Sequence, residues 1–323
     1  MPVNQTLTAL PGVRVGHWTN PVARTGCTVI LMPPGGAVAS CEVRGGAPGT
    51  RETALLEPSK SVERIHAIVL SGGSAFGLAT ATGVMGFLEA IGEGVKTPHA
   101  CIPIVPAAVI YDLGSGDADF RPGPEAGLAA AKAASNDAVP GGLIGAGAGA
   151  MTGKYLGFEG AQPGGLGGAR LEVGGVTLCA LVVANPHGDV IDANGTVISG
   201  ARKADGSRPE FTEILEAMAA QPLTFLNANT TLVALGTNAK LSKLECFKLA
   251  QAAQIGIARA SRPSHTPFDG DTAFAFSVGD DSSTGFSSPG SSGTGSPSVP
   301  LPALIAAGQA VVAMAMRDAV RER

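Results

Sequence analysis

Charged residues are scarce in this chain, and its basic residues form no cluster. Asp, Glu, Lys and Arg together make up 15% of the 323 residues, and the formal net charge is -4. Nucleic acids and anionic membrane surfaces are recognised by concentrated Lys and Arg side chains. The composition therefore gives no basis for either partner.

Cysteines are few and widely separated. The chain has five, none of them in a C-x-x-C pair: Cys27, Cys41, Cys101, Cys179 and Cys246. Zinc sites and disulfide frameworks are recognised by closely spaced or regularly paired cysteines. Neither is indicated here, so we expect no structural metal and a reducing, cytoplasmic location.

Long hydrophobic runs are also rare. The N-terminal segment has neither the basic region nor the apolar core of a secretory signal. The only stretch of membrane-spanning length, residues 299–316, is rich in Ala and contains Gln309 and Gly308. Because Ala contributes little to membrane insertion, this stretch favours a buried helix over a membrane span.

Glycine, proline and hydrophobic residues are abundant. The chain has 46 Gly and 23 Pro, and 45% of its residues are hydrophobic. This balance is typical of a globular protein with many tight turns. The length is compatible with one large domain or with two ordinary ones.

Strand and helix patterns alternate along the first two thirds of the chain. We expect a strand at 67–70 followed by a helix at 77–90, and two strands at 169–173 and 176–183 joined by a Gly174-Gly175 turn. This pattern indicates an α/β protein with an antiparallel sheet.

Two helices and a loop are predicted in the last third of the chain. Ser242 and Glu245 form a capping box, which predicts a helix from there towards Ala260 with Leu244, Phe247 and Ala250 on its buried side. Residues 282–298 are almost entirely Ser, Gly, Thr and Pro, a composition typical of a mobile loop. A final helix is expected at 302–321.

A possible nucleophile lies where a polar segment meets a strand. Asn229 and Thr230 precede the strand-like run 231–235. A threonine hydroxyl is a weak nucleophile, but a chain that begins at Thr carries its own base, because the α-amine has a pKa of about 8. Such a Thr must first be released by cleavage. Taken alone, the same residues also fit an ordinary turn entering a strand.

Two carboxylates follow further along the chain. Asp269 and Asp271 flank Gly270, and on an extended segment their side chains would point the same way. They would then be able to bind the amine and hydroxyl of a nearby Thr. An Asx turn or a divalent-cation loop is the alternative interpretation of this spacing.

Together with other motifs, these residues resemble the DmpA-like family of self-processing hydrolases, which includes β-peptidyl aminopeptidases and nylon-oligomer hydrolases. The resemblance covers nearly the whole chain. Besides the segments at 229–231 and 267–272, it is carried by P11GVRVGH17, R44GGAPGT50, L70SGGSAFG77 and V105PAAVIYD112.

The resemblance implies a set of site residues. Thr230 matches the nucleophile, with Asn229 left at the end of the first fragment, and Asp269 and Asp271 match the pair that assists the nucleophile in nylon hydrolases. The remaining expected roles are an oxyanion donor at Asn185, an ammonium group near the nucleophile at Lys154, a substrate contact at Tyr111, and close backbone approach at Gly72 and Gly73.

The resemblance also implies the architecture and the activity. We expect an αββα sandwich in which 1–229 and 230–323 are two fragments of one folded unit, assembled as a homotetramer. The expected activity is cofactor-free hydrolysis of peptide, amide or amino-acid-oligomer bonds. Two alternatives are an acyltransferase of the ornithine acetyltransferase-like type and a non-catalytic small-molecule binding protein on the same scaffold. The sequence leaves the substrate open.

Overall fold

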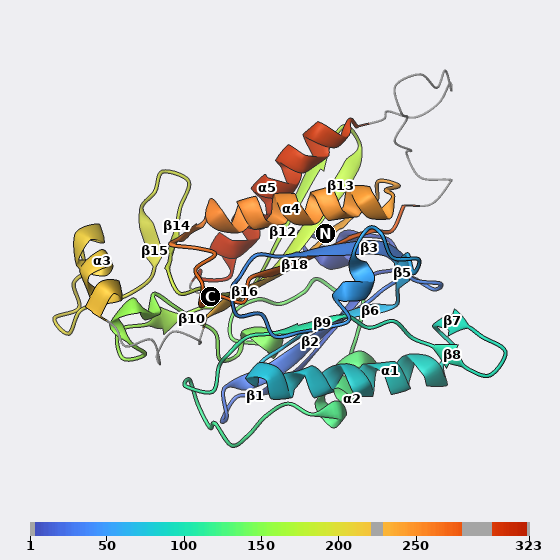
Figure 1. The fold of residues 1–323 in the computed structure, drawn as a ribbon, viewed down its shortest axis with the longest axis horizontal. Coiled ribbons are helices and arrows are strands. Elements are labelled where there is room, and N and C mark those ends of the chain that lie inside the picture. The colour runs from blue at the N-terminus through green and yellow to red at the C-terminus, as the bar shows by residue number, and fades with distance from the viewer. Residues whose placement is uncertain (1–3, 221–228, 280–298, 322–323) are drawn as a thin grey trace.

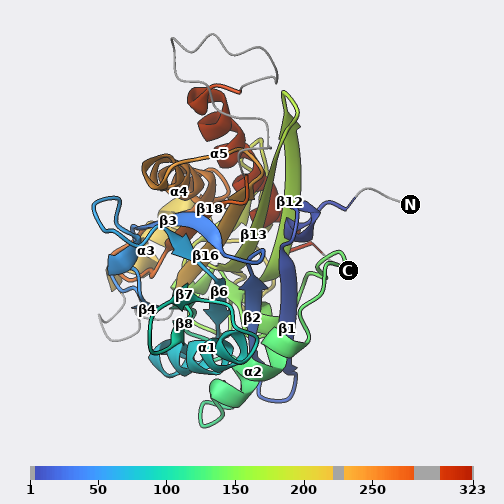
Figure 2. The ribbon, with the colours of Figure 1, turned by 90° about the vertical axis from the view of Figure 1, so that its right-hand side faces the viewer.

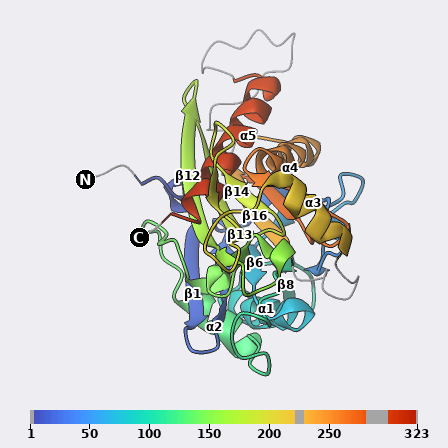
Figure 3. The same ribbon diagram turned by 90° about the vertical axis from the view of Figure 1, so that its left-hand side faces the viewer.

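Two stacked β-sheets, each covered by helices on its outer face, form the body of the protein (Figure 1). The structure, a computed structural model, describes residues 4–220, 229–279 and 299–321. Helices α1 (Thr80–Ala90) and α2 (Pro124–Lys132) cover one sheet, and α4 (Lys243–Ala258) and α5 (Leu301–Asp318) cover the other. The same order of layers is seen from both sides in Figures 2 and 3. The expected αββα sandwich is confirmed.

The first sheet lies against α1 and α2 and comes entirely from the N-terminal part of the chain. Its strands, in spatial order, are β1 (Arg14–Asn20), β2 (Thr25–Leu31), β6 (Ala67–Ser71), β9 (Ala107–Val109) and β4 (Thr50–Arg51). All pairs are antiparallel except β6 with β9.

The second sheet joins strands from both ends of the chain. Its strands, in spatial order, are β12 (Gly165–Val173), β13 (Val176–Asn185), β16 (Thr230–Thr237), β18 (Thr272–Ser277), β3 (Ala37–Val43) and β5 (Arg64–Ile65). Strands β16 and β18 run parallel, and the other pairs are antiparallel.

The centre of the second sheet is buried on both faces. Every residue of β13, β16 and β18 is buried, which explains why these strands are nearly continuous apolar runs without polar alternation. One core lies between this sheet and α4 and α5, and a second lies between the two sheets. Because β16 lies between β13 and β18, segments from both sides of Thr230 contribute strands to this sheet.

Local sequence signals place several elements correctly. The β12–β13 hairpin turns at Gly174 and Gly175, both with positive φ, and the Ser242–Glu245 capping box begins α4. The predicted helix at 77–90 is a 3-10 helix over Ser74–Ala79 that continues into α1.

One prediction about α4 is wrong. Leu244 is 55% exposed, whereas the buried side includes Cys246, Leu249, Ala253 and Ile257. Leu244 therefore faces outward in the first turn, whereas Ala250 is buried as expected.

Helix α5 packs against β12, β13 and α4, with eight buried residues facing that core. It is the one described helix long and apolar enough to cross a membrane. Its packing agrees with the expected buried helix.

Several smaller elements lie at the end of the sandwich near the start of β16. They are β10 (Met151–Thr152), β11 (Gln162–Pro163), β14 (Asp189–Ile191), β15 (Val197–Ser199), β17 (Ser261–Arg262) and α3 (Phe211–Ala220). Strands β7 (Val95–Lys96) and β8 (Cys101–Ile102) form a separate hairpin. The loop expected at 282–298 lies outside the described residues.

Candidate active site

Three segments meet at the first residue of β16. Thr230 pairs in register with Asn185, the last residue of β13. Its predecessor, Asn229, forms a parallel bridge with Asp269, in the loop that leads into β18. All of these residues are at least 96% buried. The sheet topology thus brings the predicted nucleophile, the predicted oxyanion donor and one predicted carboxylate together.

The carbonyl between Asn229 and Thr230 accepts two hydrogen bonds. The Gly270 amide donates to it over 2.9 Å, and the Thr230 hydroxyl is also hydrogen-bonded to it. A Cβ atom at Gly270 would lie 2.6 Å from Thr230 Oγ1. Position 270 therefore needs a residue without a side chain for the hydroxyl to keep its place.

We expect Gly270→Ala to slow any reaction that uses the Thr230 hydroxyl by about 100-fold, because a displacement of about 1 Å at a reacting group costs that much. The measurement is the rate at which the Asn229–Thr230 bond is cut after cell-free synthesis. Gly86→Ala in α1 is the matched control, since a Cβ there would meet nothing within 4 Å. Equal rates in the two variants would contradict this account of Gly270.

The two aspartates hold the backbone around Thr230. Asp271 Oδ1 accepts the Thr231 amide over 2.6 Å. Asp269 Oδ2 accepts the amide and hydroxyl of Thr266 over 2.8 and 2.5 Å, and its Oδ1 accepts the His187 amide over 3.3 Å. Burial, together with the negative charge of Asp271, raises the pKa of Asp269 above its ordinary value.

Lys154 is the buried cation of the site. It follows Gly153, whose positive φ turns the chain into a short 3-10 helix, Lys154–Leu156. The ammonium donates to the carbonyl oxygen and to Oδ1 of Asn185 over 2.9 and 2.8 Å. Burial lowers the pKa of Lys154 to about 7, although Asp269, Asp271 and Asp112 all act to raise it. The group therefore titrates near neutral pH.

The Asn185 side chain is oriented by several partners. Its Oδ1 accepts from Lys154 and from the Met151 amide, and its Nδ2 donates to the Tyr111 carbonyl oxygen over 3.3 Å. Because the amide oxygen only accepts, Nδ2 is the donor of this side chain. Tyr111 thus reaches the site through its main chain, and its side chain is partly buried.

The backbone amides of Gly72 and Gly73 are both used within the fold. The Gly72 amide donates to the Gly26 carbonyl over 2.8 Å, and the Gly73 amide donates to Asp112 Oδ1 over 2.7 Å. A Cβ at Gly72 would lie 2.0 Å from Asp112 Oδ2. These glycines make room for a buried carboxylate, while their predicted contact with substrate stays a prediction.

Three groups at the site carry roles that sequence reasoning missed. They are the Gly270 amide, the Asp112 carboxylate, which also accepts the Thr25 hydroxyl over 2.7 Å, and the His265 imidazole. The glycine between two aspartates was a visible signal for the first. The Asp112 carboxylate depends on contacts with residues far apart in the chain, so nothing local marked it. The His265 ring lies only six residues before its partner Asp271, but the contact requires the loop conformation that the structure shows.

The chain is similar to several known proteins. A model of peptidase family S58 matches residues 5–322. An uncharacterized aminopeptidase of Mycobacterium leprae is 41% identical over 296 residues, covering 86% of this chain and 79% of the relative. A 6-aminohexanoate-oligomer endohydrolase of Agromyces sp. is 35% identical over 269 residues, covering 82% and 72%.

Two solved structures share the fold. A Burkholderia sp. beta-aminopeptidase superposes with a TM-score of 0.69 at 24% identity, covering 98% of this chain and 86% of that one. An L-aminopeptidase D-Ala-esterase/amidase from Ochrobactrum anthropi, described as a variant of the Ntn hydrolase fold, superposes with a TM-score of 0.70 at 21% identity and the same coverage. The sandwich is therefore of the Ntn hydrolase type.

Proposed function

Because the chain belongs to peptidase family S58, whose members hydrolyse amide bonds, we propose that it cuts itself between Asn229 and Thr230 and then uses Thr230 as an N-terminal nucleophile. The observation that carries this proposal is the Asn229 carbonyl. It lies at the start of a buried strand, polarised by the Gly270 amide and in contact with the Thr230 hydroxyl.

Self-cleavage would proceed by an N-to-O shift. The Thr230 hydroxyl oxygen attacks the Asn229 carbonyl carbon, and the developing oxyanion is stabilised by the Gly270 amide. The C–N bond then breaks, the hydroxyl proton passes to the leaving amine, and an ester joins the two residues. Water hydrolyses that ester, which leaves a carboxylate on Asn229 and a free hydroxyl and α-amine on Thr230.

Turnover would repeat the same chemistry on a substrate amide. The Thr230 α-amine takes the hydroxyl proton as the oxygen attacks, and the leaving amine of the substrate receives a proton in turn. In both reactions Lys154 and the Asn185 amide group would help to stabilise the oxyanion, because Lys154 bonds to Asn185 and Asn185 pairs in register with Thr230. The acyl-enzyme is then hydrolysed by water. No metal or organic cofactor takes part in this scheme.

The two groups of relatives suggest the substrate class. The mycobacterial aminopeptidases are more similar to this chain than the 6-aminohexanoate-oligomer endohydrolases are. The Asp-Gly-Asp pair nevertheless resembles the nylon-hydrolase pattern. We therefore propose that the substrate is a small amide with a free amine on its acyl side. We also propose that the protein is a cytoplasmic homotetramer of cleaved protomers.

A panel of amides tests the proposed activity. The purified protein is incubated with an L-aminoacyl anilide, a β-aminoacyl anilide and linear 6-aminohexanoate oligomers, and the products are identified by mass spectrometry. We expect hydrolysis of at least one of these, with loss of activity in Thr230→Ala. Acyl products formed only when an amine acceptor is added would favour the acyltransferase, and binding without turnover would favour the binding protein.

A further inference from the structure

We propose that His265, as an imidazolium, is a positioning residue that fixes Asp271 against the start of β16 and so sets the attack geometry of Thr230. This inference rests on the proposed function for its effect on rate, but the ion pair itself can be tested independently. His265 lies six residues before Asp271, and its ring bonds to the Asp271 carboxylate and to the Gln254 carbonyl oxygen.

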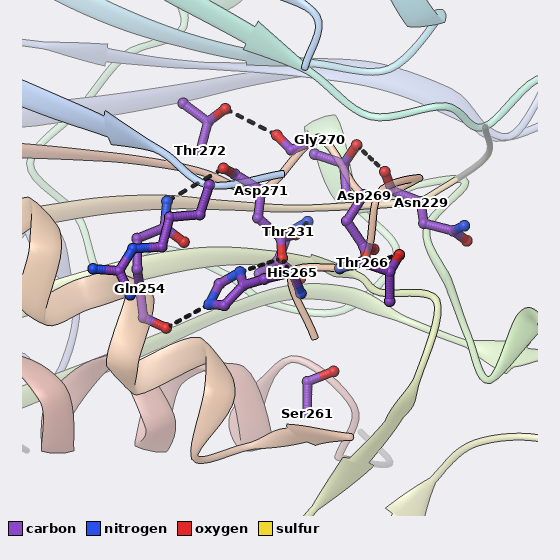
Figure 4. Close-up of polar contacts among 12 residues, drawn as sticks. Asn229, Thr231, Gln254, Ser261, His265, Thr266, Asp269, Gly270, Asp271 and Thr272 are labelled. Atoms are coloured by element: carbon purple, nitrogen blue, oxygen red, sulfur yellow. Dashed lines mark hydrogen bonds and ion pairs between the residues drawn. The ribbon is translucent and has the colours of Figure 1, made fainter. Parts of the chain in front are cut away.

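The Asp271 carboxylate is held from two sides. Its Oδ2 lies 2.8 Å from His265 Nδ1 and accepts the His265 amide over 3.2 Å. Its Oδ1 accepts the Thr231 amide over 2.6 Å. Figure 4 shows the imidazole between Asp271 and the backbone of α4, on the side of the carboxylate away from Asn229. One oxygen therefore faces the nucleophile strand, and the other faces the histidine.

The partners of the ring define its charge state. His265 Nε2 lies 3.0 Å from the Gln254 carbonyl oxygen, and Nδ1 faces the Asp271 carboxylate. Both partners are acceptors, so both ring nitrogens must carry protons for both bonds to form. Burial acts to lower the pKa of His265, but the hydrogen bond to Asp271 and its charge outweigh that effect and raise the pKa above 6.5.

The hydrogen bonds among Gln254, His265 and Asp271 form a closed ring. The buried Gln254 side chain donates to the Asp271 carbonyl oxygen over 3.2 Å and to the Glu42 carbonyl oxygen over 2.7 Å. The Gln254 side chain thus holds the Asp271 main chain. The Gln254 main-chain carbonyl holds the His265 ring, which in turn holds the Asp271 side chain. His265 itself has a φ of 56°, an uncommon conformation for a non-glycine residue.

The charges facing the ring come from few elements. Asp271 is supplied by the loop that carries His265, and Arg44, just after β3, acts to lower the pKa of the ring. Helix α4 contributes the uncharged Gln254 carbonyl, and β16 contributes the uncharged Thr231 amide to the same carboxylate. The carboxylate is therefore the partner that keeps the imidazole protonated, and its removal should release that proton.

The ion pair can be tested by NMR on the uncut Thr230→Ala protein. The five histidine rings are titrated, and the His265 signal is assigned with the additional change His265→Gln. We expect the His265 pKa to lie above 6.5 and to fall when Asp271→Asn is added. A pKa that is the same with and without the Asp271 carboxylate would overturn the proposal.

The effect on the nucleophile is tested by timing self-cleavage after cell-free synthesis. We expect His265→Gln to slow cutting by about 10- to 100-fold, as expected for a small misplacement of the reacting group, while the melting temperature stays within a few degrees of the wild type. His99→Gln, at an exposed position, is the control and should cut at the wild-type rate. Unchanged cutting in a folded His265→Gln protein would overturn the positioning role, whereas failure of the wild type to cut would count against the proposed function alone.

Discussion

A Thr230→Ala variant should be recovered as one uncut chain without amidase activity. Alanine removes the hydroxyl that contacts the Asn229 carbonyl, so neither self-cleavage nor acyl-enzyme formation has a nucleophile. The loss should exceed about 1,000-fold, as for the removal of other covalent nucleophiles. Intact mass spectrometry of the purified variant and an amidase assay measure the two effects separately.

The neighbouring threonine provides a matched control. Thr231 is equally buried, and among the described residues its hydroxyl has no hydrogen-bond partner. Thr231→Val keeps the shape and the amide bonded to Asp271, so it should cut and turn over normally. Thr230→Ser, which retains a hydroxyl, should also cut. An active Thr230→Ala protein, or an inert Thr231→Val protein, would place the nucleophile elsewhere.

Replacing Lys154 with Met should slow self-cleavage by about 100-fold or more, comparable to the loss of one oxyanion donor. Methionine keeps the length of the side chain but removes the charge and both hydrogen bonds to Asn185. The buried Asp269 and Asp271 then also lose their shared cation. Lys203→Met is the control, because Lys203 makes its ion pair with Glu213 near α3 at the surface.

The same residue should determine the pH dependence of cutting. The ammonium form of Lys154 is present below its pKa of about 7 and is lost as the pH rises through it. Asp269 must be ionised. Because its pKa is raised, its carboxyl group loses its proton at a pH above the ordinary value of 3.8. The rate should therefore pass through a maximum and fall above about pH 7. A rate that keeps rising beyond pH 8 would instead indicate neutral Lys154 acting as a base.

Much of the fold was predictable because the signals were local. The Gly174-Gly175 turn and the Ser242 capping box each depend on a few adjacent residues. The buried side of α4 was less predictable, since small residues lie on nearly all sides of this helix. Leu244 was expected to be buried, but the buried side of the helix carries Cys246, Leu249 and Ile257 instead.

The site was predictable only as a set of residues. Thr230, Asp269, Asp271, Lys154 and Asn185 were expected from their motifs, and the structure brings them together. Which of these residues contact one another was not predictable from the sequence, because the Asp271 contact with Thr231 depends on β16 lying between β13 and β18. The roles of the Gly270 amide and the His265 ring follow from that arrangement.

The most direct test of the central claim is N-terminal sequencing and intact mass spectrometry of the purified wild-type protein. The account predicts two fragments of 229 and 94 residues, adding up to the 323-residue chain, with the second beginning at Thr230. A wild-type protein that stays in one piece yet hydrolyses amides would contradict it.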